Sequence, residues 1–410
     1  MGPVTLHLTD CEDVAWFRDE PEAARGAAAA LGRRIGLTEH RTAELVLAVA
    51  ELATNITKHA VEGSLLLRVL RTAHVAGVEV VVVDGGPGIT DVPAALRDGM
   101  STAGTLGIGL GAVQRLADAF HIHSRRGLGT VQVARFWPRP PHHTVTGEPT
   151  VGGITRPIGG EQVCGDAWAG RPDIAEHVTQ HHDERTDRRP RPEESSLDWS
   201  ALTATRPPLR RAPTTPGLPP RIPPLAVTAR TSRSVPVRAA APGPGRGTLV
   251  MSCDGLGHGP MASLAAKAAV QAFRTGTART PEQAMEQIHR ALRGTRGAAV
   301  AVARLEPDGR VLFCGTGNIT AALVTADSRS NLLSHPGIVG HQMHQLRTYE
   351  HHLPGHGVLV MHSDGLSERW KSEDLAGFLH HPPALIAAAL LRLAGTRRDD
   401  ASAVIAKVTR

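Results

Sequence analysis

The sequence predicts an α+β protein with two folded domains and an unstructured segment inside the second. At 410 residues, the chain is longer than one hydrophobic core usually supports. Hydrophobic residues make up 41% of it, and they recur with helical and strand-like periods on both sides of a proline-rich segment. That segment, residues 172–246, contains 14 prolines, 12 arginines and 8 acidic residues. Its few apolar side chains cannot offset the entropy lost on ordering, so we expect it to be disordered.

The domain boundaries follow changes in composition. The first folded pattern ends at the proline cluster WPRPPHH, which begins at Trp137. We therefore expect a first domain at 1–137, a linker at 138–152 and a second domain at 153–410, interrupted by the insert 172–246.

The charge distribution argues against a nucleic-acid partner. Lys and Arg total 45 against 39 Asp and Glu, but residues 1–137 carry 13 basic and 15 acidic side chains, and residues 247–410 carry 17 and 13. No basic stripe with aromatic side chains emerges, and aromatics are only 3% of the chain. The four cysteines form no CxxC pair, the N-terminus has no apolar signal segment, and no run approaches 18 apolar residues. We expect a cytoplasmic protein without a membrane partner.

The first chemical pattern lies on a helix predicted at residues 40–60. Leu45, Ala48, Val49 and Leu52 form its apolar stripe. Glu51 and Asn55 are spaced i, i+4 and therefore share one face of the helix. A carboxylate and an amide placed in this way can serve as general base and metal ligand, although the same pairing is common on solvated helices.

Two glycine-rich segments follow this helix. A strand from Val78 to Val83 ends at Asp84 and runs into Gly85, Gly86 and Gly88, so the base of a nucleotide can approach the backbone while Asp84 accepts a hydrogen bond from an adenine amino group. Further on, glycines open a predicted helix whose free amides suit phosphate: Gly107, Gly109 and Gly111. One such glycine pattern is weak evidence, but the three elements in this order predict a nucleotide site.

Residues 20–136 resemble the GHKL ATP-binding family, and within it the serine kinases of the RsbT and RsbW kind, which act on anti-sigma-factor antagonists. The resemblance lies in the motifs ELATN, DGGPG, GIGLG and GLGT. It implies a GHKL (Bergerat) α/β sandwich in which Glu51 activates the attacking serine hydroxyl, Asn55 holds Mg²⁺ and Asp84 reads adenine. The implied nucleotide-binding residues are Asn55, Asp84, Gly86, Gly88, Gly107, Gly109, Gly111 and Thr130.

Histidine kinases share the same ATP pocket, but they need a preceding helical segment that bears the acceptor histidine. Only about 20 residues precede the matched region here, and His40 is expected to be a surface residue. A histidine kinase is therefore not expected. A pocket that binds ATP only for regulation stays open as an alternative to the serine kinase.

The second chemical pattern consists of aspartates at strand ends in the C-terminal region. A strand at 248–253 ends at Asp254, a strand from Gly357 to His362 leads to Asp364, and the pair Asp399 and Asp400 opens the last strand-like run. Asp166 stands in the segment VCGDAW. A single Asp-Gly is usually only a turn. Four such points can converge on one sheet edge, and their hard oxygen atoms suit Mg²⁺ or Mn²⁺ rather than zinc.

This region resembles the metal-dependent PPM serine/threonine phosphatases, in the bacterial SpoIIE-like branch. The segments RGAAVAVARL and GTGNI bring it nearest to the RsbX type. The resemblance implies an α-β-β-α sandwich with two metal ions that generate a hydroxide. The implied ligands are Asp166, Asp254, the Gly255 carbonyl, Asp364 and Asp399. Asp400 remains the alternative to Asp399. One departure is the long insert between Asp166 and Asp254, which either gates the site, docks a partner or has no role.

Together the two patterns predict a bifunctional protein-serine kinase and phosphatase in a partner-switching system. The expected cofactors are ATP, Mg²⁺ and Mn²⁺. The expected partners are STAS-domain antagonist proteins and, beyond them, a stress sigma factor or another phosphatase. Two alternatives remain open: a phosphatase with an ATP-sensing or docking domain, and a non-enzymatic adaptor. Opposed activities in one chain would waste ATP, so reciprocal control is expected. The oligomeric state is not predicted.

Overall fold

The computed structural model describes residues 4–5, 8–18, 20–72, 74–97, 109–139, 145–159, 161–173, 235–237, 247–343 and 345–408. Its N-terminal part is built on a five-stranded antiparallel sheet with the strand order β2-β3-β4-β6-β5. The strands are β2 (Asp10–Phe17), β3 (Ser64–Arg71), β4 (Ala76–Asp84), β5 (Ala119–Arg125) and β6 (Gly129–Phe136).

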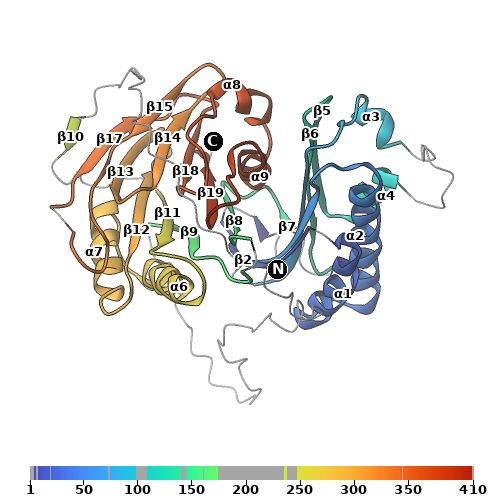
Figure 1. The fold of residues 1–410 in the computed structure, drawn as a ribbon, viewed down its shortest axis with the longest axis horizontal. Helices are drawn as coiled ribbons and strands as arrows, with labels where there is room; N and C mark the ends of the chain where they lie inside the picture. The colour runs from blue at the N-terminus through green and yellow to red at the C-terminus, as the bar shows by residue number, and fades with distance from the viewer. Residues whose placement is uncertain are drawn as a thin grey trace, which may run out of the picture.

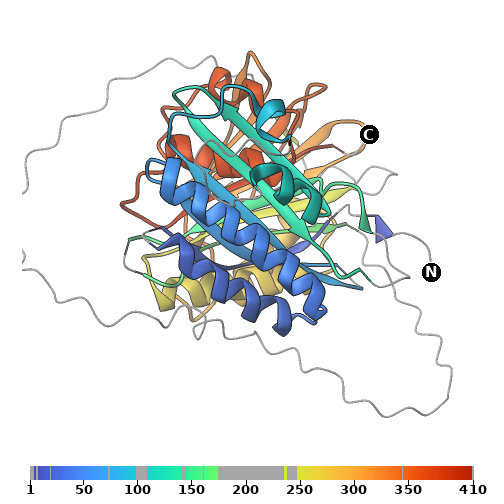
Figure 2. The ribbon, with the colours of Figure 1, turned by 90° about the vertical axis from the view of Figure 1, so that its right-hand side faces the viewer.

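Helices cover one face of this sheet, as Figures 1 and 2 show. They are α1 (Ala24–Arg34), α2 (Glu39–His59) and α4 (Gly109–Leu116), with a short 3-10 turn (Pro21–Ala23) before α1 and a four-residue helix α3 (Val92–Ala95). Thr38 caps α2 by accepting a hydrogen bond from the Arg41 amide at 3.2 Å. The apolar stripe predicted for α2 is buried in the core that it shares with α1 and the sheet.

The C-terminal part contains two stacked antiparallel sheets between helices. The first sheet has the order β10-β17-β13-β12-β11-β9, and the second has the order β15-β14-β18-β19-β8. In the first, β16 (Ser334–His335) pairs beside β13. The remaining strands of the first sheet are β9 (Asp166–Pro172), β10 (Val235–Val237), β11 (Thr248–Gly255), β12 (Ala298–Leu305), β13 (Arg310–Thr316) and β17 (Thr348–His352). Those of the second are β8 (Val151–Arg156), β14 (Thr320–Val324), β15 (Arg329–Leu332), β18 (Val358–His362) and β19 (Ala401–Ala406).

The helices of this part lie on the outer faces of the two sheets. Helices α6 (Pro260–Thr275) and α7 (Pro281–Ala291) pack on the first sheet, and α9 (Pro383–Ala394) packs on the second. A short helix α8 (Ser372–Leu375) and a 3-10 turn (Ala376–Phe378) precede α9. This is the predicted α-β-β-α sandwich, so the fold class of both parts is confirmed.

Helix α9 is the element that joins the two parts. One side of it contacts β8 and β19 of the second C-terminal sheet, and another contacts β4 and β6 of the N-terminal sheet. Figure 1 shows α9 between these two sheets. Its side chains share a single core cluster with Val81, Val83, Val131 and Val133. A helix packed on opposite sides needs apolar residues all round, which explains the sequence PALIAAALLRLA.

Buried charges complete the junction between the parts. Arg68 is 1% exposed, lies 3.2 Å from a carboxylate oxygen of Glu79, and donates a hydrogen bond from Nη1 to the Gly153 carbonyl at 2.8 Å. Asp13 accepts hydrogen bonds from the backbone amide and hydroxyl of Thr155 at 2.8 and 2.6 Å. The N-terminal sheet is therefore covered on both faces, which agrees with the nearly continuous apolar run of β4.

The disorder predicted for residues 172–246 lies largely outside the described residues. The predicted start is slightly too early, because β9 extends to Pro172 and the following Asp173 is buried and 2.6 Å from Nη1 of Arg304. Within the predicted insert, β10 pairs with β17.

Two strands lie within or overlap the predicted linker 138–152. The short strand β7 (Val145–Thr146) pairs with β1 (Val4–Thr5), and β8 already begins at Val151. The domain boundaries at 137 and 153 remain a proposal. Among the helices of the described residues, none has both the length and the apolar character needed to cross a membrane.

Candidate nucleotide and metal sites

The predicted nucleotide residues Glu51 and Asn55 lie one turn apart on α2, and both are partly buried. A Glu51 carboxylate oxygen accepts a long hydrogen bond, 3.4 Å, from the amide of Gly109. Gly109 is the first residue of α4. The carboxylate therefore lies at the N-terminal end of a helix, where free amides and the helix dipole favour negative charge.

Asp84 ends β4 opposite Thr130 of β6. Its Oδ1 accepts a hydrogen bond from the Gly86 amide at 2.8 Å. Burial raises the pKa of Asp84, while hydrogen bonds from Gly86 and Thr130 act in the opposite direction. The structure thus brings Asp84 and Thr130 together, as predicted, with an acceptor oxygen positioned at the strand end.

Steric contacts explain why glycine is needed around Asp84. A Cβ on Gly86 would lie 2.8 Å from the His59 carbonyl oxygen. Gly88 has a φ of +72°, and a Cβ there would lie 2.2 Å from the Arg125 carbonyl oxygen. Gly129, which the sequence did not single out, has φ +81°, and a Cβ there would lie 1.9 Å from the Asp84 carbonyl oxygen. Its place in the GLGT motif was the signal that could have revealed it.

The remaining predicted glycines lie at the start of α4. Gly109 has φ +72° and Gly111 is buried within the helix. Gly107 lies outside the described residues. The acceptor at Asp84, the amide oxygen of Asn55 and the helix N-terminus fit an adenine nucleotide with its divalent cation.

The candidate metal site begins with two facing aspartates. Asp166 of β9 and Asp254 of β11 are direct partners in the antiparallel register. Asp166 is 5% exposed, and neither carboxylate oxygen has a hydrogen-bond partner of normal geometry among the described residues. Burial, followed by repulsion from Asp254, raises its pKa well above the usual value. A buried carboxylate in this condition fits a site completed by a cation.

Two further carboxylates gather beside this pair. Burial, followed by repulsion from Asp364 and Asp399, raises the pKa of Asp254 to about 7. Burial and then Asp399 also raise the pKa of Asp364, whose Oδ2 accepts a hydrogen bond from Asn318 at 2.6 Å. The structure therefore brings together all four predicted aspartates. This oxygen-only donor set suits Mg²⁺ or Mn²⁺.

Gly255 closes β11 next to Asp254. Its amide donates a hydrogen bond to the Gly165 carbonyl at 3.1 Å, and a Cβ on Gly255 would lie 2.4 Å from the Ala262 carbonyl oxygen. Within the described residues, no three His, Cys, Asp or Glu side chains already surround one metal position. A bound cation would therefore draw the carboxylates closer together.

Asp399 and Asp400 have different surroundings. Asp400 is 3% exposed, and its two carboxylate oxygens accept hydrogen bonds from the amides of Ile158 and Gly165, each at 2.7 Å. Asp399 is exposed, and its Oδ1 accepts a hydrogen bond only from the Asp400 amide, at 2.9 Å, among the described residues. This difference favours Asp399 as the ligand and Asp400 as a support for the loop that carries Gly165.

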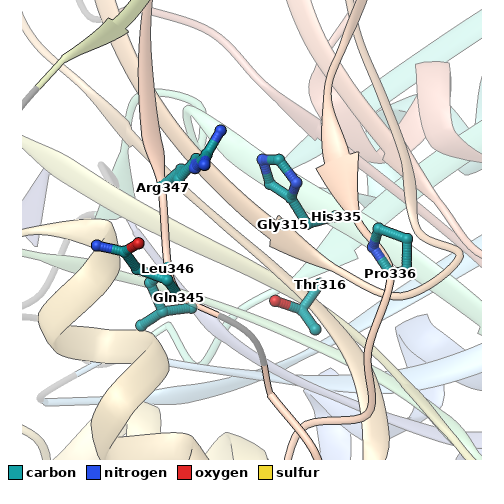
Figure 3. A pocket seen from close by; sticks show the side chains of 7 residues that line it. All are labelled: Gly315, Thr316, His335, Pro336, Gln345, Leu346 and Arg347. Atoms are coloured by element: carbon teal, nitrogen blue, oxygen red, sulfur yellow. The ribbon is translucent and has the colours of Figure 1, made fainter.

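Residues of the GTGNI motif contribute to two different places, the carboxylate cluster and a separate pocket. Its Asn318 orients Asp364, a contact that the sequence did not predict. Its first two residues line a shallow pocket, shown in Figure 3, together with His335, Pro336, Gln345, Leu346 and Arg347. None of the predicted metal ligands lines this pocket. It is therefore separate from the carboxylate cluster.

Comparison with known proteins identifies a family for each of the two domains. Residues 18–135 match the family described as histidine kinase-like ATPase domain, and residues 244–409 match the family described as stage II sporulation protein E (SpoIIE). The serine/threonine-protein kinase RsbT of Bacillus subtilis (strain 168) is 35% identical over 117 residues, which make up 28% of this chain and 88% of RsbT.

The chain belongs to the RsbT family through its N-terminal domain. Its C-terminal domain is of the SpoIIE type, so a GHKL kinase-like domain is fused to a SpoIIE-like phosphatase domain, as the motifs predicted. The enzyme classes that go with these domains are an ATP-dependent protein-serine kinase and a PPM-type protein-serine phosphatase.

Several solved structures are also similar. A structure of RsbX in complex with magnesium has a TM-score of 0.41 and 13% identity, and the match covers 63% of this chain and 94% of that one. A stressosome protein structure has a TM-score of 0.40 and 22% identity, covering 63% and 98%. The RsbU and RsbW domains of Rv1364c from Mycobacterium tuberculosis match with a TM-score of 0.33 and 21% identity, covering 39% and 53%.

Proposed function

We propose that the protein phosphorylates and dephosphorylates a serine of the same STAS-domain antagonist protein, and so controls a sigma factor by partner switching. The observation that carries this proposal is that both sites retain their reactive side chains within one continuous body. Glu51 is available beside a helix N-terminus, and four carboxylates gather at the second site. The similarity to RsbT supports the kinase half.

In the kinase half, Asp84 would accept a hydrogen bond from the adenine amino group and fix the orientation of the nucleotide. Asn55 would hold Mg²⁺, which neutralises phosphate charge. Glu51 would accept the proton of the attacking serine hydroxyl. Phosphoryl transfer depends mainly on positioning and charge neutralisation, so this small set of residues is sufficient.

In the phosphatase half, Asp254, Asp364, Asp399 and the Gly255 carbonyl would hold divalent cations, with Asp166 behind them. The bound cations would supply a hydroxide at neutral pH and polarise the phosphoryl group. Asn318 holds Asp364 in place through its side-chain amide. Asp400 fixes the backbone near Gly165, to which Gly255 is hydrogen-bonded.

The kinase is tested by transfer of labelled phosphate from ATP to a purified STAS-domain antagonist protein. Transfer by the wild type that is lost in Glu51→Ala supports the kinase. Nucleotide binding should persist in that variant, because Asp84 and the glycine loops are unchanged. Absence of transfer by both proteins contradicts the kinase half.

The phosphatase is tested separately with the phosphorylated STAS-domain protein and Mn²⁺. Asp254→Asn and Asp364→Asn should each lose the metal-dependent activity. A wild type without any metal-dependent activity contradicts this half.

A phosphatase that only senses ATP is the second candidate function. It is favoured by the direct packing of α9 on the strands that carry the nucleotide residues. It predicts nucleotide binding with no transfer to protein, whereas the bifunctional proposal predicts both.

A further inference from the structure

Helix α9 lies directly behind the nucleotide residues. Val83 and Val131 belong to the same core cluster as the α9 side chains. In sequence, Val83 precedes Asp84 and Val131 follows Thr130, so these valines project to the opposite face of the sheet from their neighbours. The phosphatase domain therefore packs against the very strand ends that form the nucleotide site.

The C-terminal end of α9 has polar links to the N-terminal domain. Burial lowers the pKa of Arg392, in the last turn of the helix, and the charge of Asp84 acts in the opposite direction. Beyond the helix, Nη2 of Arg397 donates a hydrogen bond to Oε2 of Glu62 at 3.0 Å. Glu62 lies three residues after α2, the helix that bears Glu51 and Asn55.

The same end of α9 is also tied to the metal ligands. The Ala394 carbonyl accepts a hydrogen bond from the Ser367 amide at 2.8 Å, and the Thr396 amide donates to the Gly365 carbonyl at 2.9 Å. Gly365 directly follows Asp364. Asp399 is only two residues beyond Arg397. Asp399 therefore belongs to the segment that the N-terminal domain contacts, and Asp364 precedes a residue that is hydrogen-bonded to this segment.

We propose that an adenine nucleotide in the N-terminal site is also an effector of the phosphatase, and that α9 and residues 395–400 carry the effect. The proposal rests on the proposed role of Asp364 and Asp399 as metal ligands. A nucleotide bound at the ends of β4 and β6 fixes these strand ends, against which Val83 and Val131 pack α9, and so holds the end of α9 and the contact between Arg397 and Glu62 in place. The observed gathering of the carboxylates is then favoured, so the nucleotide tightens metal binding. Such coupling is reciprocal, because binding free energies are linked.

The experiment uses the full chain, adenosine and Mn²⁺, with p-nitrophenyl phosphate as the substrate. Adenosine carries the adenine amino group but no phosphate, so it neither chelates Mn²⁺ nor donates a phosphoryl group. Saturating adenosine should lower the Mn²⁺ concentration for half-maximal hydrolysis about fivefold, which is in the usual range of coupling between sites. Asp84→Asn should remove this effect together with adenosine binding.

Variants locate the path of the effect. Arg397→Ala and Glu62→Ala should each reduce the adenosine-induced change in the half-maximal Mn²⁺ concentration from about fivefold toward no change. The double variant should reduce this change no further, because both substitutions remove the same contact. The matched control is Arg274→Ala, which breaks another ion pair between the domains, with Asp10 at 3.1 Å, away from α9. It should keep the full factor. A loss of coupling in the control equal to that in Arg397→Ala would overturn the assigned path.

A second measurement separates this proposal from the proposed function. If no hydrolysis occurs at any Mn²⁺ concentration, the phosphatase function fails, and coupling is then read by calorimetry as the Kd for Mn²⁺ with and without adenosine. The Kd for adenosine should change by the same factor when Mn²⁺ is present. Unchanged values of both constants, or an absence of adenosine binding, would overturn the proposal.

Discussion

Asp166 and Asp254 face each other in register across β9 and β11. Burial, followed by repulsion from Asp254, raises the pKa of Asp166, and burial, followed by repulsion from Asp364 and Asp399, raises the pKa of Asp254. Like charges held together without a cation destabilise the folded state. Asp254→Asn should therefore raise the thermal unfolding temperature in the presence of a chelator. It should also abolish the increase that Mn²⁺ produces in the wild type. A variant that keeps the Mn²⁺-induced increase would contradict the assignment of Asp254 as a ligand.

The two adjacent aspartates should respond differently to removal. Asp400→Ala leaves the buried amide of Gly165 and the partly buried amide of Ile158 without acceptors, and an unsatisfied buried group costs on the order of 1 to 3 kcal/mol. It should lower the unfolding temperature in the absence of metal. Asp399→Ala should leave that temperature nearly unchanged but raise the Mn²⁺ concentration needed for activity. The opposite pattern would make Asp400 the ligand.

The glycine at position 129 should be essential for the nucleotide site. Alanine at Gly129 adds a Cβ 1.9 Å from the Asp84 carbonyl oxygen, so the strand end must shift. The matched control is Gly127→Ala, which has a similar φ of +74° but no atom within 4 Å of the new Cβ. It should cost only about 1 to 2 kcal/mol of backbone strain. ATP affinity measured by calorimetry should fall sharply in the first variant and little in the second; equal losses would contradict the steric account.

The buried charges at the junction predict that the two domains unfold together. Arg68→Ala would leave Glu79, 1% exposed, with Arg135 as its remaining arginine partner, so the loss should be smaller than the about 3 to 5 kcal/mol of a fully uncompensated buried charge. Denaturant unfolding should show one transition with a lower midpoint. The control Arg71→Ala, on the same strand but 39% exposed, should change the midpoint little. Two separate transitions in the wild type would contradict a shared core.

A histidine cluster at the same junction predicts loss of stability at acidic pH. Nδ1 of His123 lies 3.2 Å from Nε2 of His381, and burial, followed by His380, His123, His121 and Lys407, lowers the pKa of His381 to about 3. An unfolded histidine titrates near 6.5. Between about pH 3 and 6.5 the unfolded state binds more protons, so stability falls as the pH falls through this range.

The variant His381→Gln should weaken this dependence, because it removes the proton that only the unfolded chain binds. The exposed neighbour provides the control His380→Gln, which should retain more of the wild-type slope. The measurement is the unfolding temperature between pH 7 and 5. Identical slopes in the wild type and His381→Gln would contradict a role for this histidine.

The sequence predicted the candidate catalytic and ligand-binding residues better than it predicted how the two domains pack against each other. Glu51 and Asn55 are one helical turn apart, and Asp84 ends a strand, so local periodicity places them correctly. The convergence of Asp166 and Asp254 depends on strands far apart in the chain; their places at strand ends suggested that it could occur, and the family resemblance gave their role as ligands. Gly107 lies outside the described residues.

The junction could not be predicted because its packing is tertiary. The apolar sequence of α9 indicates a buried helix, but nothing local tells which second surface covers it. In the N-terminal domain, the apolar residues on both faces of β4 indicate that both faces of this strand are covered. In the sequence alone, Arg68 and Glu79 look like ordinary solvated charges of two strands. Only the packing of the second domain against the sheet shows that they are buried.

The central claim is that one chain adds and removes phosphate at the same serine. The most direct measurement is mass spectrometry of a STAS-domain protein incubated with ATP, Mg²⁺ and Mn²⁺ and with wild-type, Glu51→Ala or Asp254→Asn protein. The account predicts intermediate occupancy of one serine with the wild type, none with Glu51→Ala and nearly full occupancy with Asp254→Asn. Equal occupancy with the wild type and Asp254→Asn, or phosphorylation that persists with Glu51→Ala, would contradict it.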